Sequence, residues 1–242
     1  MLLPSAPRRP PLPRRALVLV LLLAACLGLV AVLGRPTGSA PGSPPRDRVT
    51  PLLEAVAVVT ERPAVPGYER DCSGDAACVF GPAWSDATTA PGSQNGCSTR
   101  IDVLVRDLNA STPTRSGACT IDGGRLIDPY TGRVVDTGDS GVRGIHIDHI
   151  FPLSAAWDFG AWAWTPQRRA AFANDVDHNL VAVTGGVNSR KSDFTPADWL
   201  PPDPARHCFY AARYLTAATA YGLPVTEADH DALSAAVRRC PG

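Results

Sequence analysis

Hydrophobic residues form one long uncharged run near the N-terminus of the chain and a series of short, periodic segments after it. Residues 16–33 contain no charged side chain, and the residues before them are rich in Pro and Arg. A basic segment followed by such a run is typical of an export signal, and the run is also long enough to span a membrane as a helix. We therefore expect a basic N-terminal region over residues 1–15 and a signal peptide or membrane anchor over residues 16–34. Cys26 leaves lipidation open as a third alternative.

Turn-forming residues dominate the segment that follows. Residues 36–51 are rich in Pro, Gly, Ser and Thr, so we expect a flexible linker over residues 35–55. The remainder, residues 56–242, is long enough to form one domain with a sizeable hydrophobic core.

Helical and strand-like periods both occur in this remainder, which predicts an α+β fold class. Ser98, Thr165-Pro166 and Thr226 are typical helix starts, and Gly222 is a typical helix end. The expected elements are a helix over 98–108, a hairpin over 120–127 that turns at Gly123-Gly124, a turn over 128–132, a strand over 142–150, a helix over 166–173, a strand over 179–183, a short helix after Thr195, a helix over 207–221 and a last helix after Thr226.

Charge is distributed unevenly along the chain. The whole chain has 23 basic and 23 acidic residues, but six arginines and no acid lie within residues 1–46. The rest therefore has 17 basic and 23 acidic residues, a net charge of −6. An acidic domain is a poor non-specific binder of polyanions unless a metal or a local basic patch intervenes, so this balance counts against nucleic acid as substrate.

Six cysteines follow the apolar run. An even number beyond an export signal favours three disulfides, and the absence of a Cys-x-x-Cys spacing disfavours a zinc cluster. Fifteen pairings are open in principle. Pairing of the nearest neighbours in sequence predicts Cys72–Cys78, Cys97–Cys119 and Cys208–Cys240.

Candidate chemistry is concentrated between residues 145 and 193. Asp148 and His149 are adjacent at the expected end of a strand, where the turning chain can bring both side chains to one cleft. An Asp oxygen suits Mg²⁺ or Mn²⁺, and a His suits general-base catalysis near neutral pH. Asn179 leads the next apolar strand. Asn188 and Lys191, the only lysine of the chain, are spaced to share a helix face.

These residues resemble the HNH, or His-Me finger, nucleases, and in particular the exported actinobacterial HNH-domain proteins related to the C-terminal domain of modification-dependent restriction enzymes. The resemblance covers about residues 65–242. The matching segments are Asp148-His149-Ile150-Phe151-Pro152-Leu153, Ala156-Trp157, Gly160-Ala161, Phe172-Ala173-Asn174-Asp175, Asn179-Leu180-Val181-Ala182-Val183, Asn188-Ser189-Arg190-Lys191, Trp199-Leu200-Pro201-Pro202 and Cys208-Phe209-Tyr210, with Tyr68-Glu69-Arg70-Asp71, Asn95-Gly96-Cys97-Ser98-Thr99-Arg100 and Asp128-Pro129-Tyr130-Thr131-Gly132 upstream.

The resemblance implies a ββα-metal core at about residues 142–195, with flanking helices. In that arrangement Asp148 and Asn188 would hold one divalent metal, Mg²⁺ foremost with Mn²⁺ and Zn²⁺ as alternatives. His149 would be the general base. Asn179 would hold the loop between the strands and orient the imidazole, and Lys191 would contact the phosphate.

Two arginines are further candidates for phosphate contacts. Arg70 and Arg100 lie in matching segments, and the competing interpretation for each is a structural pair with an Asp. Two departures from the family pattern affect local geometry. The segment from Asp175 to Asn179 is about one residue longer than expected, and Ser192 stands where Gly is usual.

The resulting hypothesis is an exported, metal-dependent endonuclease acting on DNA, with RNA as an alternative substrate and no organic cofactor. It would act outside the cell or at the outer face of the cytoplasmic membrane, with the membrane as a partner if residues 16–34 are retained. A non-catalytic, disulfide-stapled envelope module with a structural metal site is the rival, which the charge of −6 favours. Hydrolysis of another phosphodiester of the envelope is a third alternative.

Overall fold

A computed structural model describes residues 39–72, 78–108, 119–121 and 123–242. The expected signal or anchor at residues 16–34 lies outside the described residues. Within the described ranges no helix combines the length and apolarity that a membrane crossing requires. Residues 38–242 form one compact unit.

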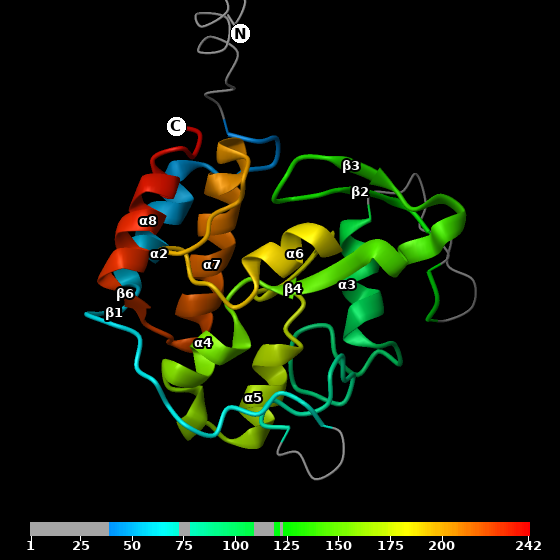
Figure 1. Cartoon of the computed structure of the whole chain (residues 1–242), viewed down its shortest axis with the longest axis horizontal. Helices are drawn as coiled ribbons and strands as arrows, with labels where there is room; N and C mark the ends of the chain where they lie inside the picture. Colours follow the sequence, from blue (N-terminus) through cyan, green and yellow to red (C-terminus); the bar gives the residue numbers. More distant parts are fainter. Residues whose placement is uncertain (1–38, 73–77, 109–118, 122) are drawn as a thin grey trace, which may run out of the picture. The chain divides into compact units, whose positions relative to one another are not determined.

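An antiparallel pair of strands lies at the centre of this unit and leads directly into a short helix (Figure 1). His149 at the end of β4 pairs with Leu180 at the start of β5, and Ile145 pairs with Thr184. Two α-helices and a 3₁₀ turn occupy the connection between the strands. The bounds are β4 Ile145–His149, α4 Leu153–Asp158, η2 Ala161–Ala163, α5 Pro166–Ala173, β5 Leu180–Thr184 and α6 Gly185–Lys191.

Alternate residues of β5 face two different hydrophobic cores, because successive strand side chains point to opposite faces. Leu180 and Ala182 pack in one core with the helix α3 (Thr99–Asp107). Val181 and Val183 pack in the other, larger core with the remaining helices. The strand pair is therefore covered on both faces, which fixes its register and the direction of each side chain.

Three helices of the larger core lie side by side in Figure 1: α2 (Arg46–Ala55), α7 (His207–Tyr221) and α8 (Glu227–Val237). Gly222 ends α7 in the left-handed conformation, with φ of 67°. Thr226 begins α8 with a complete capping box to Asp229. The short parallel pair β1 (Val58–Val59) and β6 (Val225–Thr226) joins the chain that follows α2 to the residues that precede α8.

Helix α2 corrects the expected boundary of the linker. It begins at Arg46, inside the segment 35–55 that was predicted to be flexible. Val49 is only 1% exposed in the larger core, and Arg46 donates hydrogen bonds to the carbonyls of Arg238 and Cys240. Tertiary packing of an apolar face therefore outweighs the local Pro-rich composition.

The hairpin before the central strands also differs from its prediction. Strand β2 (Arg125–Ile127) pairs with β3 (Val134–Asp136), so the chain reverses at residues 128–132 and not at Gly123-Gly124. A 3₁₀ segment, η1 (Gly138–Gly144), then leads into β4. The short helix expected after Thr195 is only a turn, and a 3₁₀ turn η3 (Pro204–Arg206) precedes α7.

Three disulfides join near neighbours in sequence: Cys72–Cys78, Cys97–Cys119 and Cys208–Cys240. Cys208 belongs to α7 and Cys240 follows α8, so this bond ties together two helices of the larger core. The bond between Cys72 and Cys78 constrains the irregular segment before α3.

Candidate functional site

A polar cleft of about 250 Å³ opens at the end of β4. It brings together four of the residues expected at the site: Asp148, His149, Asn188 and Arg70. Arg70 and Asn188, which are 118 positions apart in the sequence, therefore meet around one space. The complete lining is Tyr68, Arg70, Ile147, Asp148, His149, Pro152, Leu153, Ser154, Asn188, Ser192 and Asp193.

Asp148 is almost completely buried at this cleft, with 5% of its surface exposed. Its Oδ1 accepts a hydrogen bond from Lys191 Nζ at 3.0 Å, and its Oδ2 accepts one from the Tyr130 hydroxyl at 2.6 Å. Burial raises the pKa of this carboxyl, while Lys191 and Tyr130 oppose that effect. The charged form is thus held in place by two fixed donors.

Lys191 is fully buried and does not line the cleft. Besides the ion pair with Asp148, its Nζ donates to the backbone carbonyl of His149 at 2.9 Å. This arrangement differs from the expected phosphate contact. It suits a positioning residue that fixes Asp148 and the end of β4 from behind.

Tyr130 reaches Asp148 because a buried aspartate docks the hairpin turn onto the central strands. Asp128 accepts hydrogen bonds from the backbone of Tyr130 and Thr131 with one carboxylate oxygen. With the other it accepts from the backbone N–H and hydroxyl of Thr184, where β5 passes into α6. Sequence analysis recognised this segment as a turn but missed the role of Tyr130, because its partner lies on another element.

His149 is held in one orientation on the opposite side of the strand. Its Nε2 lies 2.8 Å from the carbonyl oxygen of Ala173, at the end of α5. A carbonyl can only accept, so Nε2 carries the proton and Nδ1 is the free nitrogen of the neutral ring. The indole of Trp84, also missed from the sequence, stacks on the imidazole with ring centroids 5.8 Å apart.

Burial and the nearby positive charges of Arg70 and Lys191 lower the pKa of His149 to about 3. The imidazole is therefore neutral at pH 7 and able to accept a proton. An anion bound beside Arg70 would offset part of the positive field and raise the pKa of His149 toward the range of an effective base.

Asn179 secures the chain after β4, as expected, but does so through the backbone. Its side-chain Oδ1 accepts from the N–H of Phe151 at 2.8 Å, and its Nδ2 donates to the Phe151 carbonyl at 3.3 Å. The imidazole donates its hydrogen bond to the Ala173 carbonyl and not to Asn179, which corrects the expected orienting partner. Asn179 is fully buried, so it acts on His149 only through the shape of the loop.

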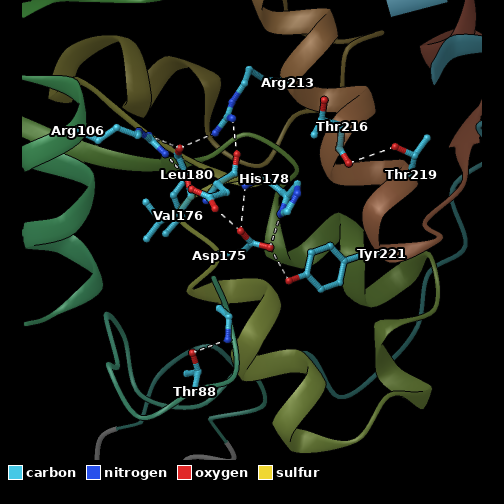
Figure 2. A network of polar contacts seen from close by, with 12 residues as sticks. Thr88, Arg106, Asp175, Val176, His178, Leu180, Arg213, Thr216, Thr219 and Tyr221 are labelled. Atoms are coloured by element: carbon cyan, nitrogen blue, oxygen red, sulfur yellow. Dashed lines mark hydrogen bonds and ion pairs between the residues drawn. The ribbon is translucent and has the colours of Figure 1, made fainter. Parts of the chain in front are cut away.

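The loop before β5 is fixed by the network in Figure 2. Asp175 Oδ1 accepts from the His178 backbone N–H, and its Oδ2 accepts from His178 Nδ1 and from the Tyr221 hydroxyl. Arg106 and Arg213 both donate to the carbonyl of Leu180, at 2.8 and 3.0 Å. Helices α3 and α7 thus both hold this loop. The expected additional residue between Asp175 and Asn179 stays a prediction.

The two candidate phosphate-binding arginines occupy different places. Arg70 is exposed and lines the cleft next to Tyr68 and His149. Arg100 is not among the residues of the cleft, and its guanidinium donates to the backbone carbonyls of Val142 and Ile145. Arg70 therefore remains the candidate for a phosphate contact, whereas Arg100 supports the start of β4.

Oxygen donors in the cleft fit a hard divalent cation. Each Asp148 oxygen accepts one hydrogen bond and keeps a further acceptor position, because a carboxylate has about four such positions. Asn188 lines the same cleft from α6, and Asp193, which sequence analysis missed, adds another carboxylate. Among the described residues, no group of three or more His, Cys, Asp or Glu side chains is placed to hold a metal ion. The expected ligand pair contains only one residue of these types, Asp148, so it would not appear as such a group.

Ser192 ends α6 in a conformation that favours glycine, with φ of 50° and ψ of −131°. Its place in the chain is where the family pattern has Gly. The departure noted in the sequence therefore carries backbone strain at the rim of the cleft.

Comparison with known proteins was consistent with this geometry. Residues 99–236, more than half of the chain, match the family model described as the C-terminal domain of GmrSD restriction endonucleases. A protein of Arthroderma benhamiae named "Uncharacterized secreted protein" is 33% identical over 219 residues, which cover 89% of this chain and 97% of the relative. No solved structure matches the chain. The relative is fungal, so the actinobacterial type expected from the sequence stays a prediction.

Proposed function

Because the chain belongs to the family of the C-terminal domain of GmrSD restriction endonucleases, we propose that it is an exported, divalent-metal-dependent endonuclease that hydrolyses phosphodiester bonds of DNA. The observation that carries this proposal is the meeting, at one cleft, of an oriented His149 and a buried Asp148 that contacts Lys191. Export is supported by the three disulfides and by the secreted relative.

His149 supplies the base in the proposed reaction. Its Nε2–H stays bound to the Ala173 carbonyl, so Nδ1 takes the proton from the attacking water. Backbone and stacking contacts prevent rotation of the ring, which keeps the free nitrogen directed at one place. The leaving oxygen takes a proton from solvent as its bond to phosphorus breaks, and His149 then returns its own proton to solvent.

Arg70 binds the phosphodiester in this scheme. It is exposed at the cleft, and its charge suits a phosphate oxygen. The bound anion compensates the field of Arg70 at His149, so substrate binding itself makes the imidazole more basic. Arg70 and the proposed cation would be the local positive charges that attract a phosphodiester to a domain with a net charge of −6 beyond residue 46.

Asp148 and Asn188 are the proposed holders of one divalent cation, with Mg²⁺ foremost. When bound, the cation supplies electrostatic stabilisation of the charge that develops on the phosphate and the leaving oxygen. Lys191 and Tyr130 oppose the rise in the pKa of Asp148 that burial causes, and their hydrogen bonds hold its carboxylate at the cleft. Such supporting contacts commonly change metal affinity or activity by about 10–100-fold when they are removed.

Plasmid nicking by oxidised residues 38–242 tests the proposal. We expect cleavage of supercoiled DNA in Mg²⁺ or Mn²⁺, no cleavage in EDTA, and a loss on the order of 10²-fold or more in His149→Ala. His146→Ala is the matched control, because His146 is an exposed residue of the same strand that does not line the cleft. RNA in parallel reactions defines the substrate class.

Folded, metal-loaded protein that cuts neither DNA nor RNA would overturn the nuclease proposal. The non-catalytic envelope module would then be the leading interpretation. Equal cleavage by His149→Ala and wild type would retain a nuclease but reject His149 as the base.

A further inference from the structure

A second pocket lies beside the polar cleft and shares part of its wall. It has a volume of about 170 Å³. Arg70, His149 and Leu153 line both spaces, so a molecule whose phosphate lies at Arg70 has this pocket immediately next to it. The other lining residues are Asp71, Cys72, Phe80, Gly81, Pro82, Ala83, Trp84, Ala173 and Asn174.

The walls of this pocket are mainly apolar and include two aromatic rings. Phe80 is 2% exposed and is fixed by ring contacts with Trp157 and Phe172. Trp84 is half-buried and lies almost parallel to the His149 imidazole, with 15° between the ring planes. The pocket is thus a preformed apolar space against the proposed catalytic base.

Trp84 holds its position in an unfavourable backbone conformation. Its φ is +59°, which a bulky side chain rarely adopts. The backbone N–H of Thr99, at the start of α3, donates to the Trp84 carbonyl at 3.3 Å and helps to retain this conformation. Residues in such conformations cluster at binding and catalytic sites, so the strain at Trp84 supports a functional role for this wall.

We propose that this pocket binds one unpaired nucleobase of the strand whose phosphodiester lies in the cleft. The inference rests on the nuclease function proposed above and names its preferred substrate as single-stranded or locally melted DNA. An apolar cavity of about 150 Å³ accommodates one benzene molecule, so a space of about 170 Å³ has room for one planar ring.

Duplex DNA cannot place a phosphate in the cleft and a base in the adjoining pocket without distortion. Its bases are stacked and paired, and an enzyme that takes a base into a pocket must either use a single strand or extrude the nucleotide. A single strand presents base and phosphate together, which matches an apolar pocket joined to a polar cleft at Arg70. Mainly apolar walls contact a base without reading the pattern of hydrogen-bonding groups on its edge, so little sequence preference is expected.

Binding in EDTA tests the pocket separately from catalysis. Residues 38–242 are titrated into a fluorescein-labelled 12-nucleotide single strand, the same sequence as a duplex, and an abasic strand of equal length, with anisotropy as the readout. We expect the ordinary strand to bind about tenfold more tightly than the duplex or the abasic strand, which is the smaller end of the stacking contribution of one base.

Two leucine substitutions form a matched pair for this test. Ala83 and Ala87 are both exposed residues of the same segment, but only Ala83 lines the pocket beside His149, whereas Ala87 lines a different surface hollow. Ala83→Leu should fill the pocket and remove the roughly tenfold advantage of the ordinary strand. Ala87→Leu should preserve it. Thermal unfolding checks both proteins, and Trp84→Leu gives a second test if Ala83→Leu does not fold.

Cleavage in Mg²⁺ separates failure of this inference from failure of the nuclease proposal. The ratio of kcat/KM for single strand to that for duplex should exceed about ten in the wild type and fall toward one in Ala83→Leu. If the protein nicks plasmid but binds the single strand, the duplex and the abasic strand with equal affinity, the pocket inference alone would be overturned. No cleavage together with base-dependent binding that Ala83→Leu abolishes would support the nucleobase site and reject the chemistry. Neither cleavage nor base-dependent binding would reject both.

Discussion

Replacing Lys191 with Met removes a buried positive charge while keeping a side chain of similar length. Lys191 is 0% exposed, and its Nζ donates to Asp148 Oδ1 at 3.0 Å and to the His149 carbonyl at 2.9 Å. Met offers no donor, so both acceptors lose a partner. The Asp148 carboxylate then keeps only the hydrogen bond from Tyr130.

The expected cost at pH 7 is about 3–5 kcal/mol in the free energy of unfolding, the usual range when one partner of a buried ion pair is removed. Most of this cost arises because Asp148 is left with an uncompensated charge. Asp148→Asn in the Lys191→Met protein removes that charge, so the double variant should be more stable than Lys191→Met alone. The coupling between the two changes should be about 2 kcal/mol.

The pH dependence of this cost has a defined sign. Burial already raises the pKa of Asp148 above its usual range, and loss of Lys191 would raise it further. The folded protein then binds a proton at Asp148 more strongly than the unfolded chain does. Stability of the variant therefore falls as pH rises through the pKa of folded Asp148, and the deficit should shrink at acidic pH.

Urea unfolding of oxidised residues 38–242 in EDTA measures these differences. Arg190→Met is the matched control, because Arg190 is the exposed neighbour on α6, and its change should be within about 0.5 kcal/mol. A Lys191→Met protein as stable as this control would refute the structural role of the ion pair. If the changes in the free energy of unfolding of Lys191→Met and Asp148→Asn simply add in the double variant, the cost does not come from an unpaired Asp148 carboxylate.

Three further predictions concern the cleft. Tyr130→Phe removes the donor to Asp148 Oδ2, so the Mg²⁺ concentration for half-maximal cleavage should rise about tenfold, and an unchanged titration would contradict the role of Tyr130. Arg70→Gln removes a positive charge that lowers the pKa of His149, so the acid limb of the pH profile of kcat/KM should move to higher pH. Because the proposed phosphate contact is also lost, kcat/KM at pH 7 should fall about tenfold or more. Ser192→Gly removes the side chain that makes a positive φ unfavourable, so thermal unfolding should show a protein more stable by about 1 kcal/mol. A less stable protein would show that the Ser192 backbone is not strained.

Elements with strong local signals could be predicted from the sequence. Thr165 accepts a hydrogen bond at the start of α5, the capping box of Thr226 forms, and α7 ends at Gly222. Each of these signals depends on backbone groups within one turn of the residue concerned. Helix α2 has no such signal, because its Pro-rich composition resembles a linker and only packing against α7 and α8 makes it helical.

The site was predictable as a set of neighbours but not as a set of contacts. The sequence pattern indicated Asp148, His149 and Asn188 as residues of one cleft. It could not indicate that Lys191 would be buried behind Asp148, because burial depends on α6 packing against β4 and β5. Trp84 was missed for the same reason, since a tryptophan in an irregular segment has no local signal for contact with an imidazole.

The polar cleft has two walls of different construction. Asp148 and His149 stand on a strand pair that is covered by a core on each face, whereas Arg70 and Trp84 belong to a segment without a described helix or strand. The matched family region begins at residue 99 and so contains the first wall but not the second. Under the proposed function, substitutions around residues 68–84 would therefore change which substrate fits the cleft without altering the strand pair that carries Asp148 and His149.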